Sequence, residues 1–137
     1  MQHTEKYQFN LIEGADDFSP QPLNQNTQRT EALLAGRARL AAGSYTGTGQ
    51  YGEDHPTVLE IPDAERPPSV IMVSHPEGFF KAVLVRGMEK YCVWWENYRT
   101  HNIEVTWTDK GARFYSTESD AYQLNNKDRA YYYAVLI

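Results

Sequence analysis

The sequence predicts a mainly β protein, in which an antiparallel β-sandwich follows a polar N-terminal segment and one short helix. Three observations support this class. Ten Tyr and three Trp occur in only 137 residues, and aromatic side chains pack well on the pleated surface of a sheet. Short strand-like runs follow one another from residue 44 onward, with turn residues between most of them. Good helix formers are concentrated in one run, before the first of these strands.

The first part of the chain, up to about Pro22, is polar and acidic. It contains the pair Asp16 and Asp17 and a second proline, Pro20. A segment of this composition buries too little apolar surface to order by itself, so we expect it to dock on a larger structure or on neighbouring residues. Five apolar side chains would anchor it: Tyr7, Phe9, Leu11, Ile12 and Phe18.

One helix is predicted from Leu23 to about Ala42. Residues 31–35 and 37–42 are good helix formers, and Ser19 before Pro20 is a suitable N-terminal cap. Six side chains follow the alternating three- and four-residue steps of a coiled-coil seam: Leu23, Asn26, Thr30, Leu33, Arg37 and Leu40. Half of them are polar and the run is short, so a trimerisation helix and a helix packed on its own domain both fit the pattern.

Eight strands are predicted in the remainder of the chain. Their expected ranges are 44–51, 57–61, 69–74, 79–86, 91–95, 103–107, 113–117 and 130–136. Turn residues such as Pro67 and Pro68 separate most of them. Because no helical run lies between these short strands, they indicate an antiparallel sandwich. The predicted domains are therefore residues 1–42, with the docking segment and the trimerisation helix, and residues 43–137, the sandwich.

Composition argues against several classes of function. The formal net charge is −5. Binding to a phosphate backbone needs clustered, positively charged Lys and Arg side chains, so we expect no nucleic-acid partner. Neither a signal peptide nor an apolar run long enough for a membrane span is recognisable. We therefore expect synthesis in a cytoplasm, no secretion by a signal peptide and no membrane insertion. Cys92 is the only cysteine, and we predict that it is a small core residue.

No arrangement of residues predicts an enzyme. Gly47 and Gly49 lack the Gly-Lys-Ser/Thr ending of a phosphate-binding loop, and Ser74 has no strand–turn–helix elbow around it although His75 follows. The four histidines are not at the spacing of metal ligands, and residues 53–55 are predicted to form a solvated turn. We expect no catalytic residue, no metal and no cofactor.

A candidate ligand-binding site lies in residues 91–101, where aromatic rings alternate with a carboxylate, an amide, an arginine and a histidine. Sugar recognition uses such a mixture, because an apolar ring lies under the C–H face of a sugar while planar polar groups bond its hydroxyls. The predicted ligand-binding residues are Trp95, Tyr98, Arg99 and His101. Trp95 is preferred because Trp94 shares a strand face with Cys92, which favours the core. The alternative, that the stretch is core and an ordinary loop, stays open.

Four stretches of the sequence have a characteristic order. They are residues 6–26, residues 43–52 with His55 and Pro56, residues 67–73, and residues 105–117 with 123–125 and 131–135. They resemble, in turn, the N-terminal opening, the first strand, the following apolar strand and the closing strands of tail-fibre and baseplate-associated proteins of phages and prophages of Gram-positive, often gut, bacteria. The order of strands is also similar to the H-type lectin sandwich, a small trimeric carbohydrate-binding fold. Fibres of this kind often carry a long repetitive shaft, and here only the helix separates the two ends.

The resemblance implies a structural or receptor-binding protein that is not an enzyme. It implies a homotrimer, made in the bacterial cytoplasm, that assembles with other tail or baseplate proteins into a virion or tail particle. The expected ligand is a glycan or other polymer on a bacterial surface. The alternative is a trimeric structural or assembly protein of a tail or baseplate that binds no ligand.

Overall fold

A computed structural model describes residues 21–96 and 99–137 of the chain. The chain divides into two compact units, Met1–Ala38 and Arg39–Ile137; we call the second one the β unit. The N-terminal docking segment and its anchors lie outside the described residues. Among the residues described, no helix is both long and apolar enough to cross a membrane.

The predicted helix is present as α1 (Gln21–Ala35), but it ends well before Ala42. The last turn closes with a hydrogen bond from the Gly36 amide to the Ala32 carbonyl, 3.1 Å. Of the good helix formers that follow, residues 40–42 belong to strand β1 (Leu40–Thr46), whose backbone pairs with β8 (Ala130–Leu136), and residues 37–39 connect the helix to this strand. The predicted extent of the helix is wrong because strand pairing outweighs intrinsic helix propensity here, and the predicted domain boundary at residue 42 falls inside β1.

The mainly β class is confirmed, and each of the eight predicted strands has a counterpart. The other six strands are β2 (Thr57–Glu60), β3 (Val70–Ser74), β4 (Phe80–Val85), β5 (Tyr91–Trp95), β6 (Arg99–Trp107) and β7 (Gly111–Tyr115). The strands β1, β6 and β7 begin earlier than predicted, and β1 and β7 also end earlier, at Thr46 and Tyr115. The other strands match the predicted ranges to within one residue at either end.

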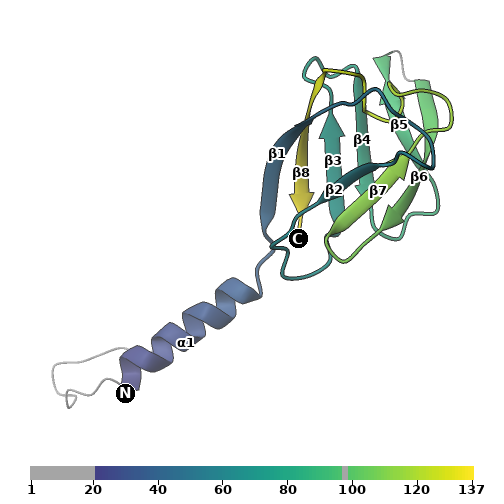
Figure 1. The fold of residues 1–137 in the computed structure, drawn as a ribbon. Helices are drawn as coiled ribbons and strands as arrows, with labels where there is room; N and C mark the ends of the chain where they lie inside the picture. The colour runs from purple at the N-terminus through teal and green to yellow at the C-terminus, as the bar shows by residue number, and fades with distance from the viewer. Residues whose placement is uncertain (1–20, 97–98) are drawn as a thin grey trace. The chain divides into compact units, whose positions relative to one another are not determined.

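The eight strands form one curled antiparallel sheet in the order β1-β8-β3-β4-β5-β6-β7-β2. The sheet turns at β6, whose first half pairs with β5 and whose second half pairs with β7. Figure 1 shows β2 and β7 crossing in front of the other strands. The predicted sandwich of two separate sheets stays unconfirmed, because hydrogen bonds connect all eight strands into one.

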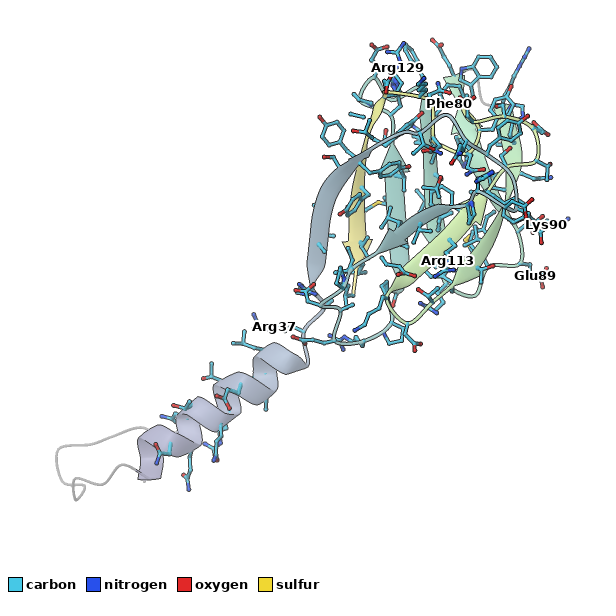
Figure 2. The ribbon with its side chains drawn as sticks, in the orientation of Figure 1. Arg37, Phe80, Glu89, Lys90, Arg113 and Arg129 are labelled. Atoms are coloured by element: carbon cyan, nitrogen blue, oxygen red, sulfur yellow. The ribbon has the colours of Figure 1, made fainter. Side chains whose placement is uncertain are left out.

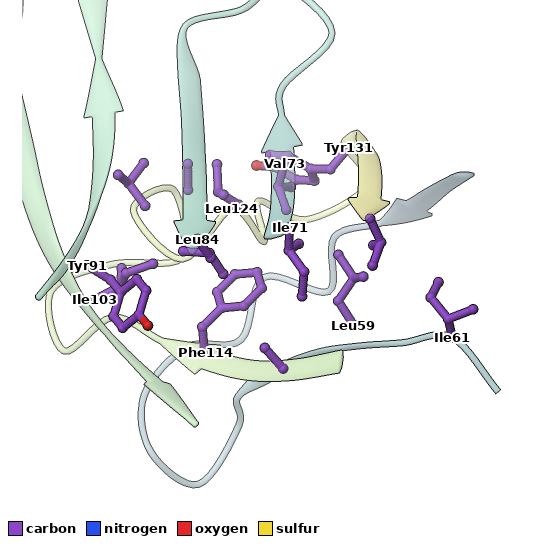
Figure 3. Close-up of a cluster of buried hydrophobic side chains, with 14 of the residues drawn as sticks. Leu59, Ile61, Ile71, Val73, Leu84, Tyr91, Ile103, Phe114, Leu124 and Tyr131 are labelled. Carbon is purple, nitrogen blue, oxygen red and sulfur yellow. The ribbon is translucent and has the colours of Figure 1, made fainter. Parts of the chain in front are cut away.

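The hydrophobic core lies inside the curl. Phe114 of β7 faces Leu84 of β4 and Ile71 of β3, and all three side chains are fully buried (Figure 3). Burying a side chain of this size contributes about 1.5–3 kcal/mol. Gly111 at the start of β7 lies so close to the Leu59 carbonyl of β2 that a side chain would not fit between them. This close approach keeps β2 and β7 against the core.

Candidate ligand-binding site

Three neighbouring strands place polar and aromatic side chains together at one end of the sheet. Phe80 at the start of β4 pairs with Trp95 at the end of β5, and Trp95 pairs with Arg99 at the start of β6. Residues directly opposite in antiparallel strands lie on one face of the sheet. Two positions further along, the same face carries the buried Ala82 and Val93. The three side chains therefore lie on the inner face, at the end of the β unit where Figure 2 labels Phe80.

The aromatic rings at this end form one contiguous group, which we call the aromatic cluster: Phe80, Trp95, His101 and Tyr122. Trp95 stacks on Phe80 with 5.6 Å between ring centroids and 16° between planes. The His101 and Tyr122 rings are nearly parallel, 3.6 Å apart and 8° inclined, and each lies 6.4 Å from Trp95. The Arg99 guanidinium is 6.0 Å from the Trp95 ring, within the range of a cation–π contact.

The His101 ring has one nitrogen in a polar contact and one without. Its Nδ1 lies 3.0 Å from Oε2 of Glu118. Since a carboxylate only accepts, we assign the hydrogen of this contact to Nδ1. Nε2 is buried and has no hydrogen-bond partner among the described residues. Buried polar atoms are normally paired, so this nitrogen is a notable feature of the cluster.

The turn that follows β7 holds Tyr122 and Glu118 in place. The Glu118 amide donates to Ser116 Oγ at 3.1 Å and the Tyr122 amide to Ser119 Oγ at 3.3 Å. Next to Tyr122, the fully buried Gln123 side chain fixes the end of the turn through its own hydrogen bonds. The resemblance groups residues 123–125 with closing strands. In the structure they lie in the connection between β7 and β8 and outside any strand, and the Gln123 and Asn125 side chains bond to other loops.

The structure brings together three of the four predicted site residues. Trp95, Arg99 and His101 lie in or beside the aromatic cluster, while Tyr98 lies outside the described residues. The reason given for preferring Trp95 is wrong, because Trp94 faces outward with 45% of its surface exposed, and Val93 is fully buried. The face that carries Tyr91, Val93 and Trp95 is the more buried of the two, and it covers the core. Trp95 remains partly exposed because it ends the strand.

Sequence reasoning missed Phe80 and Tyr122 of the cluster and Glu118 at its margin. Phe80 comes from β4, which pairs with β5. Glu118 and Tyr122 belong to the turn after β7, which the curl of the sheet brings close to His101. The signal available in the sequence was the concentration of turn-forming side chains after β7, at Ser116, Ser119 and Asp120. This concentration predicts a turn, but it does not predict where the ring of Tyr122 lies.

Two hollows elsewhere in the β unit have polar groups that the fold already uses. A hollow of about 440 Å³ lies between β1 and β2 and contains Asn125, whose amide bonds Thr48 and the Gln50 carbonyl at 2.8–3.0 Å. Another, of about 420 Å³, is bounded by residues 87–91 and β6. There the Trp107 indole donates to the Tyr91 hydroxyl at 2.8 Å. Within the described part of the chain, no group of three or more His, Cys, Asp or Glu side chains is placed to hold a metal ion.

Comparisons with known proteins identify no relative, since no protein-family model, curated protein or solved structure matches the chain.

Proposed function

We propose that this protein is a phage tail-fibre-like structural and receptor-binding protein whose β unit recognises a glycan or other polymer on a bacterial surface. The observation that carries the proposal is the aromatic cluster with Arg99 and Glu118 at its margin. Partly exposed rings and planar polar groups are combined there at the end of a rigid sheet, which is the combination that sugar recognition requires.

The cluster offers separate groups for the two kinds of sugar surface. The Trp95 and Tyr122 rings provide apolar faces for the C–H groups of a sugar ring. The Arg99 guanidinium offers several N–H donors, and the Glu118 carboxylate, about half exposed, accepts from hydroxyl groups. Because the rings are already stacked on one another, little conformational entropy is lost when a ligand binds.

The N-terminal unit supplies attachment in this proposal. Leu33 and Leu34 of α1 expose 37% and 61% of their surfaces, and an isolated helix of this length is marginal in water. The protein would be a homotrimer that docks through residues 1–42 to other tail or baseplate proteins after synthesis in the bacterial cytoplasm. It would act without catalysis, cofactor, metal, nucleic acid or membrane insertion.

A direct binding measurement tests the glycan site. Purified parent protein is titrated with polysaccharide extracted from the host cell wall, beside an Arg99→Ala variant and an Arg113→Ala control. The control removes the same charge from an exposed position of β7, away from the cluster. Loss of one anchor side chain costs about 1–3 kcal/mol, so Arg99→Ala should weaken binding about 5- to 150-fold and the control should bind like the parent.

A second pair of variants separates the two tryptophans. Trp95→Ala should weaken binding, and Trp94→Ala, on the outer face, should not. Circular dichroism checks that each variant keeps the parent's β spectrum. If Arg99→Ala and Trp95→Ala fold and bind as tightly as the parent, the aromatic cluster is not the site.

A trimeric structural or assembly protein that binds no ligand is the second candidate. It is favoured by large apolar side chains that are exposed and do not belong to the cluster, such as Leu34 of α1 and Leu40 of β1. Such side chains indicate protein contacts rather than sugar contacts. A parent protein that fails to bind host cells and wall polysaccharide, yet assembles into particles, would favour this role.

A further inference from the structure

The outer face of the sheet carries an unusual set of side chains across β1, β8, β3 and β4. The strand registers align Leu40, Leu136, Val70 and Val85 in one row. The next row contains Ala42, Ala134, Met72 and Val83, and the row after that contains Tyr132 of β8 between two serines. We call the eight residues of the first two rows, with Tyr132, the outer apolar face. None of these nine residues is charged, and Lys81 of β4 lies at their edge, in the row of Tyr132.

This pattern differs from that of the rest of the same sheet. An antiparallel sheet with one face in water normally alternates apolar and polar residues, and β6 does so, with Asn102, Glu104 and Thr106 exposed. In β3 the alternation is absent, since Ile71 and Val73 fill the core while Val70 and Met72 face outward. A strand that is apolar on both faces is expected where both faces are covered.

The size of the outer apolar face is that of a protein contact. Its six largest exposed side chains, Leu40, Met72, Val83, Val85, Tyr132 and Leu136, expose 38–63% of their surfaces. With on the order of 200 Å² for each full side chain, they expose roughly 600 Å² together. The largest apolar patch on a typical monomer is about 300–600 Å² and is often functional, so this face is at the upper end of that range. A stable interface buries about 800 Å² on each partner.

We propose that the outer apolar face packs against other copies of the same chain. A contact between identical chains must avoid placing like charges together, and a face without charges meets this condition. The chain as a whole has a net charge of −5, so copies repel one another over most of their surfaces and least at this face. The exposed apolar area is about three quarters of what each partner contributes to a stable interface. This contact goes beyond the proposed glycan recognition and places a subunit interface on the β unit, in addition to the helix.

The test compares matched substitutions in the full-length chain. Met72→Glu changes the outer apolar face, and Met88→Glu makes the same change in the turn between β4 and β5, where the methionine is equally exposed, 46% against 44%. Val83→Lys and Val58→Lys form a second pair, with 49% and 52% exposure. Using one acidic and one basic substitution separates the loss of apolar contact from the effect of net charge.

Sedimentation equilibrium over a range of micromolar concentrations gives the mass of each protein. We expect the parent and both controls to be oligomers, and Met72→Glu and Val83→Lys to raise the subunit dissociation constant at least tenfold with an unchanged circular dichroism spectrum. If both face variants keep the parent's mass, the interface lies elsewhere and the proposal is wrong. A monomeric parent would also overturn the proposal. If Met72→Glu then lowers the melting temperature of this monomer more than Met88→Glu does, residues of the same chain cover the outer apolar face. Neither result decides whether a single β unit binds a glycan, which the Arg99→Ala titration tests separately.

Discussion

Replacing Gln123 by Met should destabilise the β unit strongly, although Gln123 is not one of the apolar side chains of the core. The Gln123 side chain is fully buried. Its Oε1 accepts hydrogen bonds from the amides of Gly52, 2.9 Å, and Ser116, 3.0 Å. Its Nε2 donates to the His55 carbonyl, 2.7 Å, and to Thr57 Oγ1, 3.3 Å. One side chain thus connects the loop before β2, the end of β7 and the turn that carries Tyr122.

The expected loss follows from the groups that the substitution leaves unpaired. Methionine has nearly the same length as glutamine and neither a strong donor nor a strong acceptor, so packing is largely kept while all four hydrogen bonds are lost. A buried polar group without a partner costs about 1–3 kcal/mol. The Ser116 amide is in a buried position and bears this cost in full, whereas Gly52 and His55 are closer to the surface, where water replaces part of the loss. We expect the free energy of unfolding to fall by about 3–5 kcal/mol.

Urea denaturation followed by circular dichroism measures this change, with the free energy of unfolding extrapolated linearly to zero denaturant. Gln50→Met is the matched control, because it makes the same substitution at an exposed position of the loop that Gln123 fixes. The control should change the free energy by less than about 0.5 kcal/mol. A loss below about 1 kcal/mol for Gln123→Met, with an unchanged denaturant slope, would refute the reasoning, because the network would then contribute little beyond what water supplies.

Three further predictions concern metal, packing and pH. EDTA should leave the melting temperature unchanged, since no described cluster of ligands, residues 53–55 included, is placed to hold an ion. Gly111→Ala should cost about 2–4 kcal/mol in urea denaturation, because its Cβ would overlap the Leu59 carbonyl, whereas Gly87→Ala, in open space but at φ 98°, should cost about 1 kcal/mol. Burial raises the pKa of Tyr45, so the folded phenol stays neutral when the unfolded one ionises. Stability should therefore fall as the pH rises above about 10, and less steeply in Tyr45→Phe.

The strands could be predicted because each carries local information. The ranges of β5 and β8, Tyr91–Trp95 and Ala130–Leu136, are those read from the sequence. Both are runs of aromatic and β-branched residues with turn residues before them, which favours a strand whatever the rest of the chain does. Strand pairing order was not predictable from the same information, because it depends on which distant segments meet.

The end of the helix could not be predicted from local preferences. Residues 37–42 are as good helix formers as residues 31–35, but the last three of them belong to β1, Leu40–Thr46, which pairs with β8. Gly36, directly after the last helical residue, was the one local signal for an end. It was overlooked because the apolar spacing continues beyond it to Leu40.

The candidate site was predictable in part for a similar reason. Trp95, Arg99 and His101 lie on one hairpin, so their proximity follows from the chain itself. Which face of the hairpin turns inward does not follow from the chain itself. Cys92 and Val93 both fit a core, and the strands opposite determine which of the two faces is buried. Tyr122 stacks on His101 from a turn outside the hairpin, and a single sequence contains no signal for that contact.

The two tryptophans of β5 connect the two proposals. Trp95 faces inward to the aromatic cluster, and Trp94 faces outward in the row that also contains Tyr132 and Lys81. Because successive strand residues lie on opposite faces, a contact through the outer apolar face leaves the cluster free to bind. Joined copies would then hold a repeating polymer at several sites at once, and such linkage strengthens binding by about 10²- to 10⁴-fold without any new contact. Met72→Glu, which separates the copies, should therefore weaken binding to the whole polysaccharide and leave the affinity for a single-repeat fragment unchanged. An equal loss for both ligands would mean that the substitution disturbs the cluster itself, and the two faces of the sheet would not be independent.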